Sequence, residues 1–138
     1  MICKKIAYFS FFVALTILFS SCLKVPLKDI YGTYVAKYSF GIDKIVLKND
    51  GTYFQEVKIY DDPKFYNATG KWKLGNDDEM ITSLIIEDAF VVSDGYGRFN
   101  ENFQAQEKGL SRVIIQPQFI SRKLELITDE MVPHIKVD

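Results

Sequence analysis

Cysteine and histidine are scarce in this chain of 138 residues, which contains two cysteines and one histidine. Cys3 and Cys22 both lie in the N-terminal 22 residues, so the remainder has no disulfide and depends on its core for stability. A zinc site would need carboxylates for nearly all its ligands, because His134 has no cysteine or second histidine to join it. We therefore predict no metal site, and we expect His134 to be a surface residue of the C-terminal tail.

Catalytic motifs are missing as well. The chain has no G-x-S-x-G nucleophile elbow. The acidic turns Asp61-Asp62 and Asp77-Asp78-Glu79 lack the spacing of a calcium-binding loop. We predict a protein that is not an enzyme, with no catalytic residues and no cofactor. One enzymatic alternative stays open, because two carboxylates that converge in the fold would suit a hydrolase.

The charge pattern excludes a further class of partner. The net charge is −1, with 25% charged and 48% hydrophobic residues, which is typical of a globular domain rather than a disordered chain. The basic residues are interspersed with acidic ones and form no patch. We therefore predict no nucleic-acid partner, since such a partner requires a concentrated positive surface.

The N-terminus has the plan of a secretory signal peptide. Lys4 and Lys5 precede an apolar run over residues 6–19, and the small residues Ser20 and Ser21 follow. The run is too short for a membrane-spanning helix, which needs about 20 apolar residues. We expect residues 1–21 to be removed, which would take the net charge from −1 to −3 because the two lysines are the only charged residues there.

The end of this segment, Phe19-Ser20-Ser21-Cys22, resembles the lipobox of bacterial lipoproteins. The resemblance implies cleavage before Cys22 and acylation of its thiol, which would anchor the protein to a lipid bilayer. Two or three acyl chains attach a protein stably to a bilayer, whereas a single chain binds only marginally. Leu23 follows the cysteine where an Asp would imply retention at the inner membrane. The resemblance thus implies the periplasmic face of the outer membrane, with an ordinary cleaved signal peptide as the alternative.

The body of the chain predicts an antiparallel β domain over residues 29–138, joined to Cys22 by a tether over residues 22–28. The turn Asn49-Asp50-Gly51 lies between two apolar runs, which is the strongest short-range signal for a β-hairpin. In the second run, alternate residues share a face, with Tyr53, Gln55, Val57 and Ile59 together. We predict strands at about residues 29–40, 42–48, 52–60, 66–74, 80–87 with a continuation at 90–92, 112–116 and 123–127, and either a strand or a frayed tail at 131–138.

This spacing of short strands predicts an all-β fold, an antiparallel meander that forms a small closed or partly open barrel, with a β-sandwich as the alternative. The segment over residues 93–110 has no strand periodicity. We predict a long loop there, or a short helix at residues 101–108 with Asn100 as its N-cap and Gly109 as its stop.

Three short motifs resemble those of small bacterial lipocalin-like lipoproteins: Tyr31-Gly32-Thr33-Tyr34, the hairpin around Asp50-Gly51-Thr52-Tyr53, and Gly70-Lys71-Trp72. The resemblance covers about residues 30–90. It implies an up-and-down barrel, sometimes with a cavity for an apolar ligand, and no shared catalytic residues. The segment at residues 93–110 departs from the plainest form of that pattern.

Aromatic residues supply the candidate binding site. Residues 22–138 contain Trp72, seven tyrosines and seven phenylalanines, most of which we expect to pack in the core and across strands. We predict that Tyr96, Phe99 and Phe103, with Arg98 between them, are exposed, because a loop offers no strand face to bury them. These four residues and Trp72 are the candidates for contact with a ligand or partner.

Together these patterns predict a membrane-anchored lipoprotein of a bacterial cell envelope. We expect it to be non-catalytic and to bind either a protein of the envelope or a small apolar ligand. The main alternative is a lipocalin-like carrier of a small hydrophobic molecule, and an unrecognised hydrolase is the second.

Overall fold

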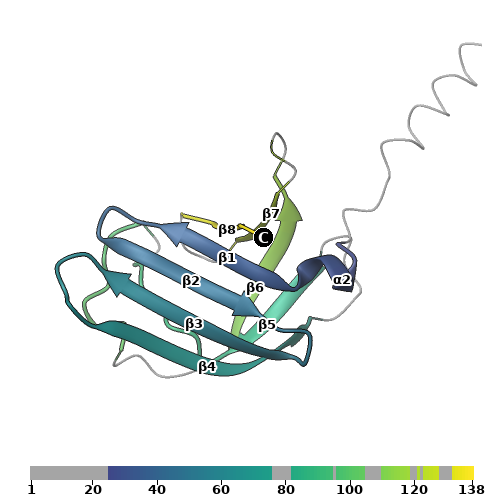
Figure 1. Ribbon diagram of the computed structural model, residues 1–138, viewed down its shortest axis with the longest axis horizontal. Helices are drawn as coiled ribbons and strands as arrows, with labels where there is room; N and C mark the ends of the chain where they lie inside the picture. The colour runs from purple at the N-terminus through teal and green to yellow at the C-terminus, as the bar shows by residue number, and fades with distance from the viewer. Residues whose placement is uncertain are drawn as a thin grey trace, which may run out of the picture.

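The strands of the chain form a closed antiparallel barrel (Figure 1). The computed structural model describes residues 25–75, 82–94, 96–104, 110–118, 121, 123–127 and 132–138. Each strand pairs with the next along the chain, and β8 returns to pair with β1. The elements are α2 (Leu27–Ile30), β1 (Gly32–Lys37), β2 (Gly41–Leu47), β3 (Thr52–Ile59), β4 (Phe65–Leu74), β5 (Thr82–Glu87), β6 (Leu110–Pro117), β7 (Leu124–Ile127) and β8 (His134–Lys136). The predicted all-β barrel is confirmed, and closure excludes the sandwich.

The β2–β3 hairpin turns where the sequence predicts it. Gly51 has φ +79°, a conformation that glycine adopts without steric cost. The Asp50 carboxylate accepts hydrogen bonds from the Thr52 amide at 2.9 Å and the Thr52 hydroxyl at 2.6 Å, and these bonds lower the pKa of Asp50. The turn fixes a register in which Leu47 lies opposite Tyr53, so the β3 face that carries Tyr53, Gln55, Val57 and Ile59 points into the barrel.

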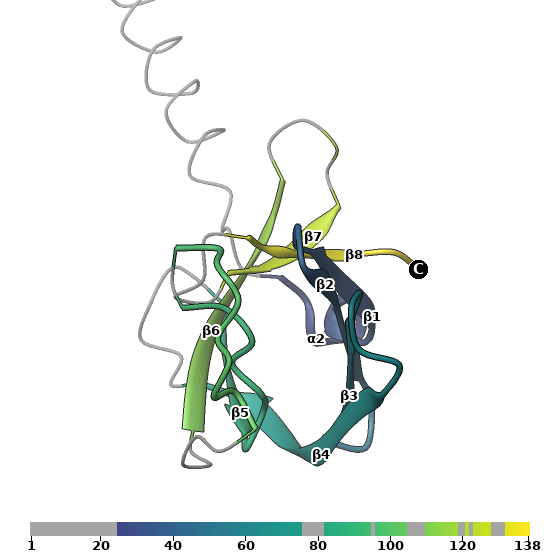
Figure 2. The ribbon, with the colours of Figure 1, turned by 90° about the vertical axis from the view of Figure 1, so that its left-hand side faces the viewer.

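The C-terminal segment completes the barrel. Residues 131–138 were predicted to be a strand or a frayed tail, and the described part forms β8, which pairs with β7 and with β1. Val137 N–H donates to the Thr33 carbonyl at 2.9 Å, and the Asp138 carboxylate accepts from the Thr33 amide. Figure 2 shows β8 beside β1 and β7 in a view from one end of the barrel. Closure removes the edges that β1 and β7 would otherwise expose.

The described residues begin at Val25, within the segment expected to be a tether. Pro26 precedes the short helix α2, and the Val25 amide donates to the Thr82 hydroxyl at 2.8 Å. Ile30 is fully buried, and its carbonyl accepts a hydrogen bond from the Tyr34 hydroxyl at 2.6 Å. The helical turn therefore packs against one end of the barrel and brings Ile30 into the core, whereas a tether was predicted up to residue 28.

Buried side chains form two apolar clusters along the barrel. The first cluster lies at the α2 end, and the second lies toward the turns that join β1 to β2 and β3 to β4. The first contains Val25, Ile30, Tyr34, Ile45, Leu47, Tyr53, Trp72, Leu84, Ile86, Val113, Ile115 and Leu126, and the second contains Ala36, Tyr38, Val57, Ile59, Val92 and Phe103.

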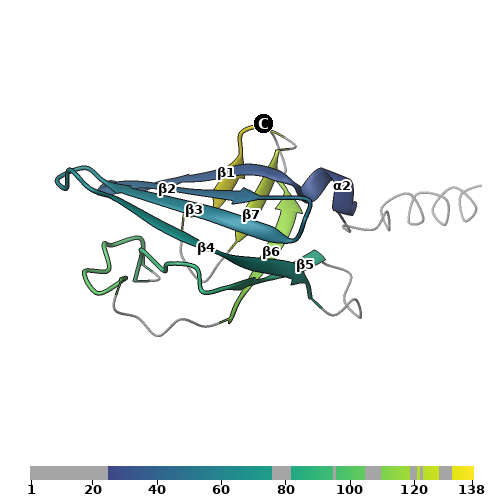
Figure 3. The ribbon, with the colours of Figure 1, turned by 60° about the horizontal axis from the view of Figure 1, so that its bottom comes forward.

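The chain leaves the sheet after β5. Asp88 has φ +60°, which few non-glycine residues adopt, and residues 90–92 do not continue the strand as predicted. Figure 3 shows the chain after β5 running toward the end where β3 turns into β4. The predicted helix at 101–108 is also wrong in its described part, because residues 101–104 form turns; residues 105–109 lie outside the described residues. The loop alternative holds for the described part.

Candidate functional site

A glutamine side chain holds the segment that follows β5. Gln55 points inward from β3 and is fully buried. Its Oε1 accepts the Phe90 N–H at 2.7 Å, and its Nε2 donates to the Phe90 carbonyl at 3.1 Å. One side-chain amide thus makes both hydrogen bonds that a neighbouring strand would offer to Phe90. This contact explains how residues 88–92 enter the barrel end without sheet pairing, since buried backbone groups need partners.

Gln55 belongs to a buried polar cluster with Asp43 and His134. Its Nε2 also donates to the two Asp43 carboxylate oxygens at 3.0 and 2.9 Å, and His134 Nε2 lies 3.0 Å from Asp43 Oδ2. The tautomer of His134 decides which of these two atoms donates in that contact. His134 Nδ1 is buried and has no hydrogen-bond partner among the described residues.

The position of His134 corrects a prediction. The side chain is 2% exposed, whereas a surface residue of the tail was expected. His134 lies opposite Leu126 in the β7–β8 register, and Leu126 is fully buried, so the side chain at position 134 points into the barrel. Sequence reasoning missed this because the tail becomes a wall of the barrel only when β8 closes it. No local sequence pattern signalled the burial of His134.

The residues of the polar cluster are arranged to hold parts of the barrel together. The cluster contains a single carboxylate, and Asp43 is the only buried acid among the described residues. Nor do three His, Cys, Asp or Glu side chains gather anywhere in the described residues to hold a metal ion. The cluster joins β2, β3 and β8 to the segment after β5, so it fixes that segment at the barrel end.

Two of the residues predicted to be exposed have buried or half-buried side chains. Phe103 is 3% exposed, and its ring packs edge-on against Tyr66 at 5.2 Å and Phe90 at 5.4 Å between centroids. Phe99 is half-buried, and the centroid of its ring lies 5.1 Å from that of Phe40. The prediction of exposure is wrong for Phe103, because the loop folds back and supplies the second cluster with its own aromatic residues.

Tyr96 and Arg98 are exposed as predicted. Tyr96 is 73% exposed, and the Arg98 guanidinium lies 5.4 Å from the centre of its ring. Asp94 accepts hydrogen bonds from the Tyr96 amide at 2.9 Å and from Arg98 Nε at 2.7 Å. Gly97 has φ +77°, which lets the chain reverse between the bridged residues Ser93 and Phe99. The turn therefore presents an aromatic ring with a cation over its face.

Two further exposed aromatic residues lie at the same end and were not predicted. Tyr60 is 54% exposed and Phe65 is 59% exposed, and they flank the turn between β3 and β4. The Tyr60 amide donates to the Phe40 carbonyl at 2.9 Å, which places that turn beside the Phe40–Phe99 contact. Lys58 Nζ lies 4.9 Å from the centre of the Phe65 ring. We call the exposed residues Tyr60, Phe65 and Tyr96 the aromatic end.

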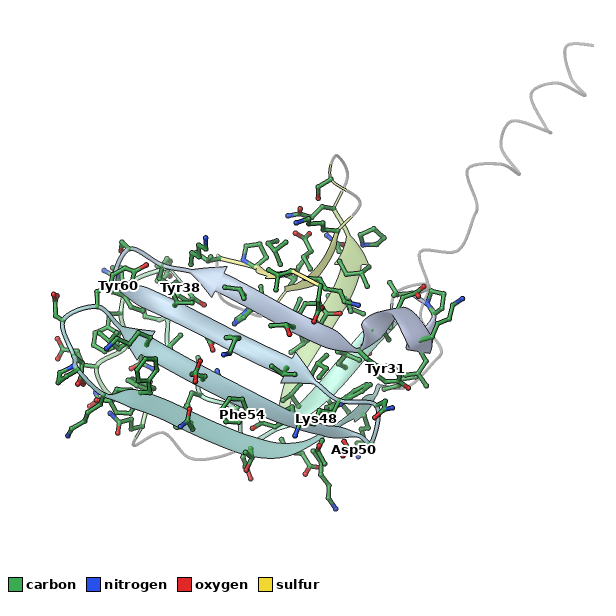
Figure 4. All side chains as sticks on the ribbon, viewed as in Figure 1. Tyr31, Tyr38, Lys48, Asp50, Phe54 and Tyr60 are labelled. Carbon is green, nitrogen blue, oxygen red and sulfur yellow. The ribbon has the colours of Figure 1, made fainter. Side chains whose placement is uncertain are left out.

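The aromatic end lies opposite α2. β3 runs from the turn beside α2 to the turn at Tyr60, and its eight residues span about 25 Å at roughly 3.3 Å per residue. Figure 4 places Tyr60 and Tyr38 at one end of the sheet, and Tyr31, Lys48 and Asp50 at the other. The sequence signal was available, because Tyr60 directly precedes the turn at Asp61-Asp62-Pro63 and Phe65 follows it after Lys64.

Trp72 lies at the α2 end and is part of the first cluster. Its indole N–H donates to the Lys48 carbonyl at 3.0 Å, and its ring packs edge-on against Tyr31 at 5.9 Å. The side chain is buried. The structure therefore places this candidate in the core, away from Tyr96 and Arg98. Cys22 and the predicted signal peptide over residues 1–21 lie outside the described residues.

The comparisons with known proteins add no relatives: no family model, no curated protein and no solved structure matches this chain. In the described part of the chain, no helix is both long and apolar enough to cross a membrane.

Proposed function

We propose that this chain is a lipid-anchored protein of a bacterial cell envelope whose barrel binds a protein partner without catalysing a reaction. The lipobox-like Phe19-Ser20-Ser21-Cys22 supports the anchor. Cys22 stands three residues before Val25, whose amide bonds to Thr82 of the barrel, and three residues reach about 10 Å at most. Acyl chains on Cys22 would therefore hold the α2 end of the barrel against the bilayer.

The packing of the interior favours a protein partner over a small apolar ligand. A carrier needs an apolar pocket that its ligand can enter. Here the first cluster contains large buried side chains from each of β1 to β7, and Ile30 of α2 adds to it at one end. At the other end Phe103 and Val92 pack into the second cluster. The side chains that would line a ligand pocket instead pack against one another.

The location of the aromatic end is the observation that carries the proposal. Single exposed apolar residues are ordinary, but Tyr60, Phe65 and Tyr96 gather at one end. That end is about 25 Å from the α2 end, measured along β3 at roughly 3.3 Å per residue. Exposed tyrosine and arginine are the residue types that contribute most to protein interfaces. A protein anchored at Cys22 would present this surface to partners away from its own bilayer.

The anchor is tested by intact mass of the protein purified from membranes of its host. We expect residues 22–138 plus two or three acyl chains, and we expect Cys22→Ala to leave the membrane fraction. An unmodified mass, or a Cys22→Ala variant that stays in the membrane, would remove the anchor from the proposal.

The binding surface is tested by a photo-crosslinking residue in place of Tyr96 or Phe65 in host cells. Val137 is the matched control, because it is also exposed but lies beside β1, where its amide bonds to Thr33. We expect one discrete protein adduct from both aromatic positions and none from Val137. Equal labelling at all three positions would mean that the aromatic end has no preferred partner.

A further inference from the structure

Part of β4 has no neighbouring strand on one side. β4 is paired with β3 along residues 65–71, but β5 pairs only with Trp72, Lys73 and Leu74. The chain turns away from β4 at Asp88, whose φ is +60°, and Gln55 then holds it beneath β3. Among the described residues, no strand lies beside residues 65–69 on the side away from β3, whereas Glu87 at the end of β5 still lies against Gly70.

The phase of the hydrogen bonds identifies the β4 backbone groups that have no partner strand among the described residues. The Trp72 amide donates to the Gly51 carbonyl at 2.8 Å, so Trp72 directs its backbone groups toward the β3 side. In an antiparallel pair alternate residues point the same way, so Tyr66 and Ala68 also bond to β3. Phe65, Asn67 and Thr69 therefore point their N–H and C=O groups away from β3, where β5 no longer runs.

The other side of β3 confirms this phase. The Tyr60 amide donates to Phe40 and the Lys48 amide donates to the Thr52 carbonyl, so the even-numbered residues of β3 bond to β2. The odd-numbered residues, including Gln55 and Val57, bond to β4 opposite Ala68 and Tyr66. Two independent observations thus assign the same three residues to the free edge.

This edge lacks most of the devices that protect exposed strands. Its pairing with β3 is one-to-one from Thr52 opposite Lys71 to Lys58 opposite Phe65, with no bulge. β4 contains no proline. Natural edge strands are usually shortened, bulged, covered, interrupted by proline or lined with charged side chains, because free backbone groups recruit another strand. Of these devices, β4 has only its lysines. The edge also starts at Phe65, one of the residues of the aromatic end.

We propose that the partner adds an extended strand of its own chain to the free edge of β4, with acidic side chains in that strand. The proposal deepens the proposed function and rests on it, because it takes the partner to be a protein. Only a polypeptide backbone offers donors and acceptors at the spacing of Phe65, Asn67 and Thr69. From Pro63 to Gly75 the chain carries Lys64, Lys71 and Lys73 and no acid.

Charge argues for a different protein rather than a second copy of this chain. The three lysines are exposed, and none is within salt-bridge distance of a carboxylate among the described residues, although the charge of Lys64 helps to lower the pKa of Asp62. A second copy would bring its own β4 with the same lysines and no carboxylate. A strand that alternates acidic and apolar residues would instead place carboxylates near Lys71 while its backbone pairs with β4.

The test uses the full chain in detergent and a water-soluble heptapeptide that alternates valine with glutamate. Hydrogen exchange is followed for each β4 amide. At ten times its Kd the peptide should slow exchange at Asn67 and Thr69 roughly tenfold. Tyr66 and Ala68 are the internal controls, because their amides already bond to β3. A lysine-for-glutamate peptide should bind at least tenfold more weakly, and a backbone N-methylated peptide should have no effect.

Two variants test the same edge from the protein side. Asn67→Pro removes one free-edge donor without removing a bond to β3, so we expect a folded protein that no longer responds to the peptide. Ala68→Pro removes a bond to Gln55 and should destabilise the barrel. If Asn67→Pro fails to fold, the N-methylated peptide provides the equivalent loss of backbone bonding.

Three results would overturn the proposal. The first is unchanged exchange at Asn67 and Thr69 with millimolar peptide, and the second is equal slowing by the lysine or N-methylated peptide. The third is slowing that grows with protein concentration alone, which would mean pairing with a second copy. If adducts from Tyr96 persist in any of these cases, the proposed function stands and only the strand addition fails. If exchange slows as expected but Tyr96 gives no adduct, strand addition stands and the aromatic end is not the contact.

Discussion

Replacing Gln55 with leucine should destabilise the protein more than any other substitution of a single polar side chain in the polar cluster. The change leaves the Phe90 N–H and C=O without partners and takes two hydrogen bonds from Asp43. Each buried polar group left unsatisfied costs about 1–3 kcal/mol. The apolar surface that leucine buries offsets about 1 kcal/mol. We expect a net loss of about 4 kcal/mol, a large part of the roughly 5–15 kcal/mol that stabilises a typical domain.

Urea unfolding measures this loss through the fluorescence of Trp72, the only tryptophan, which is buried in the first cluster. Gln116→Leu is the matched control. The Gln116 amide bonds to Glu125 at 2.9 Å, but the pair is only partly buried, so we expect a loss below about 1 kcal/mol. Hydrogen exchange at Phe90 should also accelerate in Gln55→Leu. Equal losses in the two variants, or a loss below about 1 kcal/mol for Gln55→Leu, would refute the assignment of Gln55 as the partner of Phe90.

Two further predictions follow from individual side chains. Burial raises the pKa of Tyr53 from 10.0 to about 12, and nearby carboxylates add to the effect. Because the pKa of Tyr53 is higher in the folded protein than in the unfolded chain, the contribution of its protonated hydroxyl to stability is complete below pH 10 and is lost as the pH rises toward 12. Tyr53→Phe should therefore weaken the decrease of the urea unfolding midpoint with pH above 10. An unchanged pH dependence would contradict the burial of this hydroxyl. Phe103→Ala should cost about 3–5 kcal/mol in urea unfolding, whereas Tyr96→Ala should change stability by less than about 0.5 kcal/mol. The reverse order would mean that Phe103, not Tyr96, is the exposed residue.

The polar cluster shows how the barrel accommodates an irregular segment. If β5 had continued as a strand of the sheet, the backbone groups of Phe90 would have bonded to a neighbouring strand. Instead Asp88 turns the chain inward, and the Gln55 side-chain amide bonds to them. The same turn leaves Phe65, Asn67 and Thr69 without a neighbour. One departure from regular pairing thus produces both the buried contact and the free edge.

The sequence alone determined the elements that depend on local chemistry. The turn at Asp50-Gly51 follows from the freedom of glycine at positive φ, and the division of β3 into two faces follows from a period of two residues. The antiparallel order of the strands follows from their short connections. The prediction that Tyr96 is exposed was confirmed because the turn between Ser93 and Phe99 holds it away from the barrel.

Only the tertiary structure decided the features that need distant parts of the chain. His134 is buried because β8 joins β7 to β1, and nothing near position 134 in the sequence records that closure. Phe103 is buried because Tyr66 and Phe90, which lie 37 and 13 positions earlier in the numbering, provide the surface it packs against. Gln55 looks like an ordinary polar residue until Asp43, Phe90 and the barrel interior surround it. Local patterns specify how a strand or turn forms, whereas burial and free edges depend on which strands become neighbours.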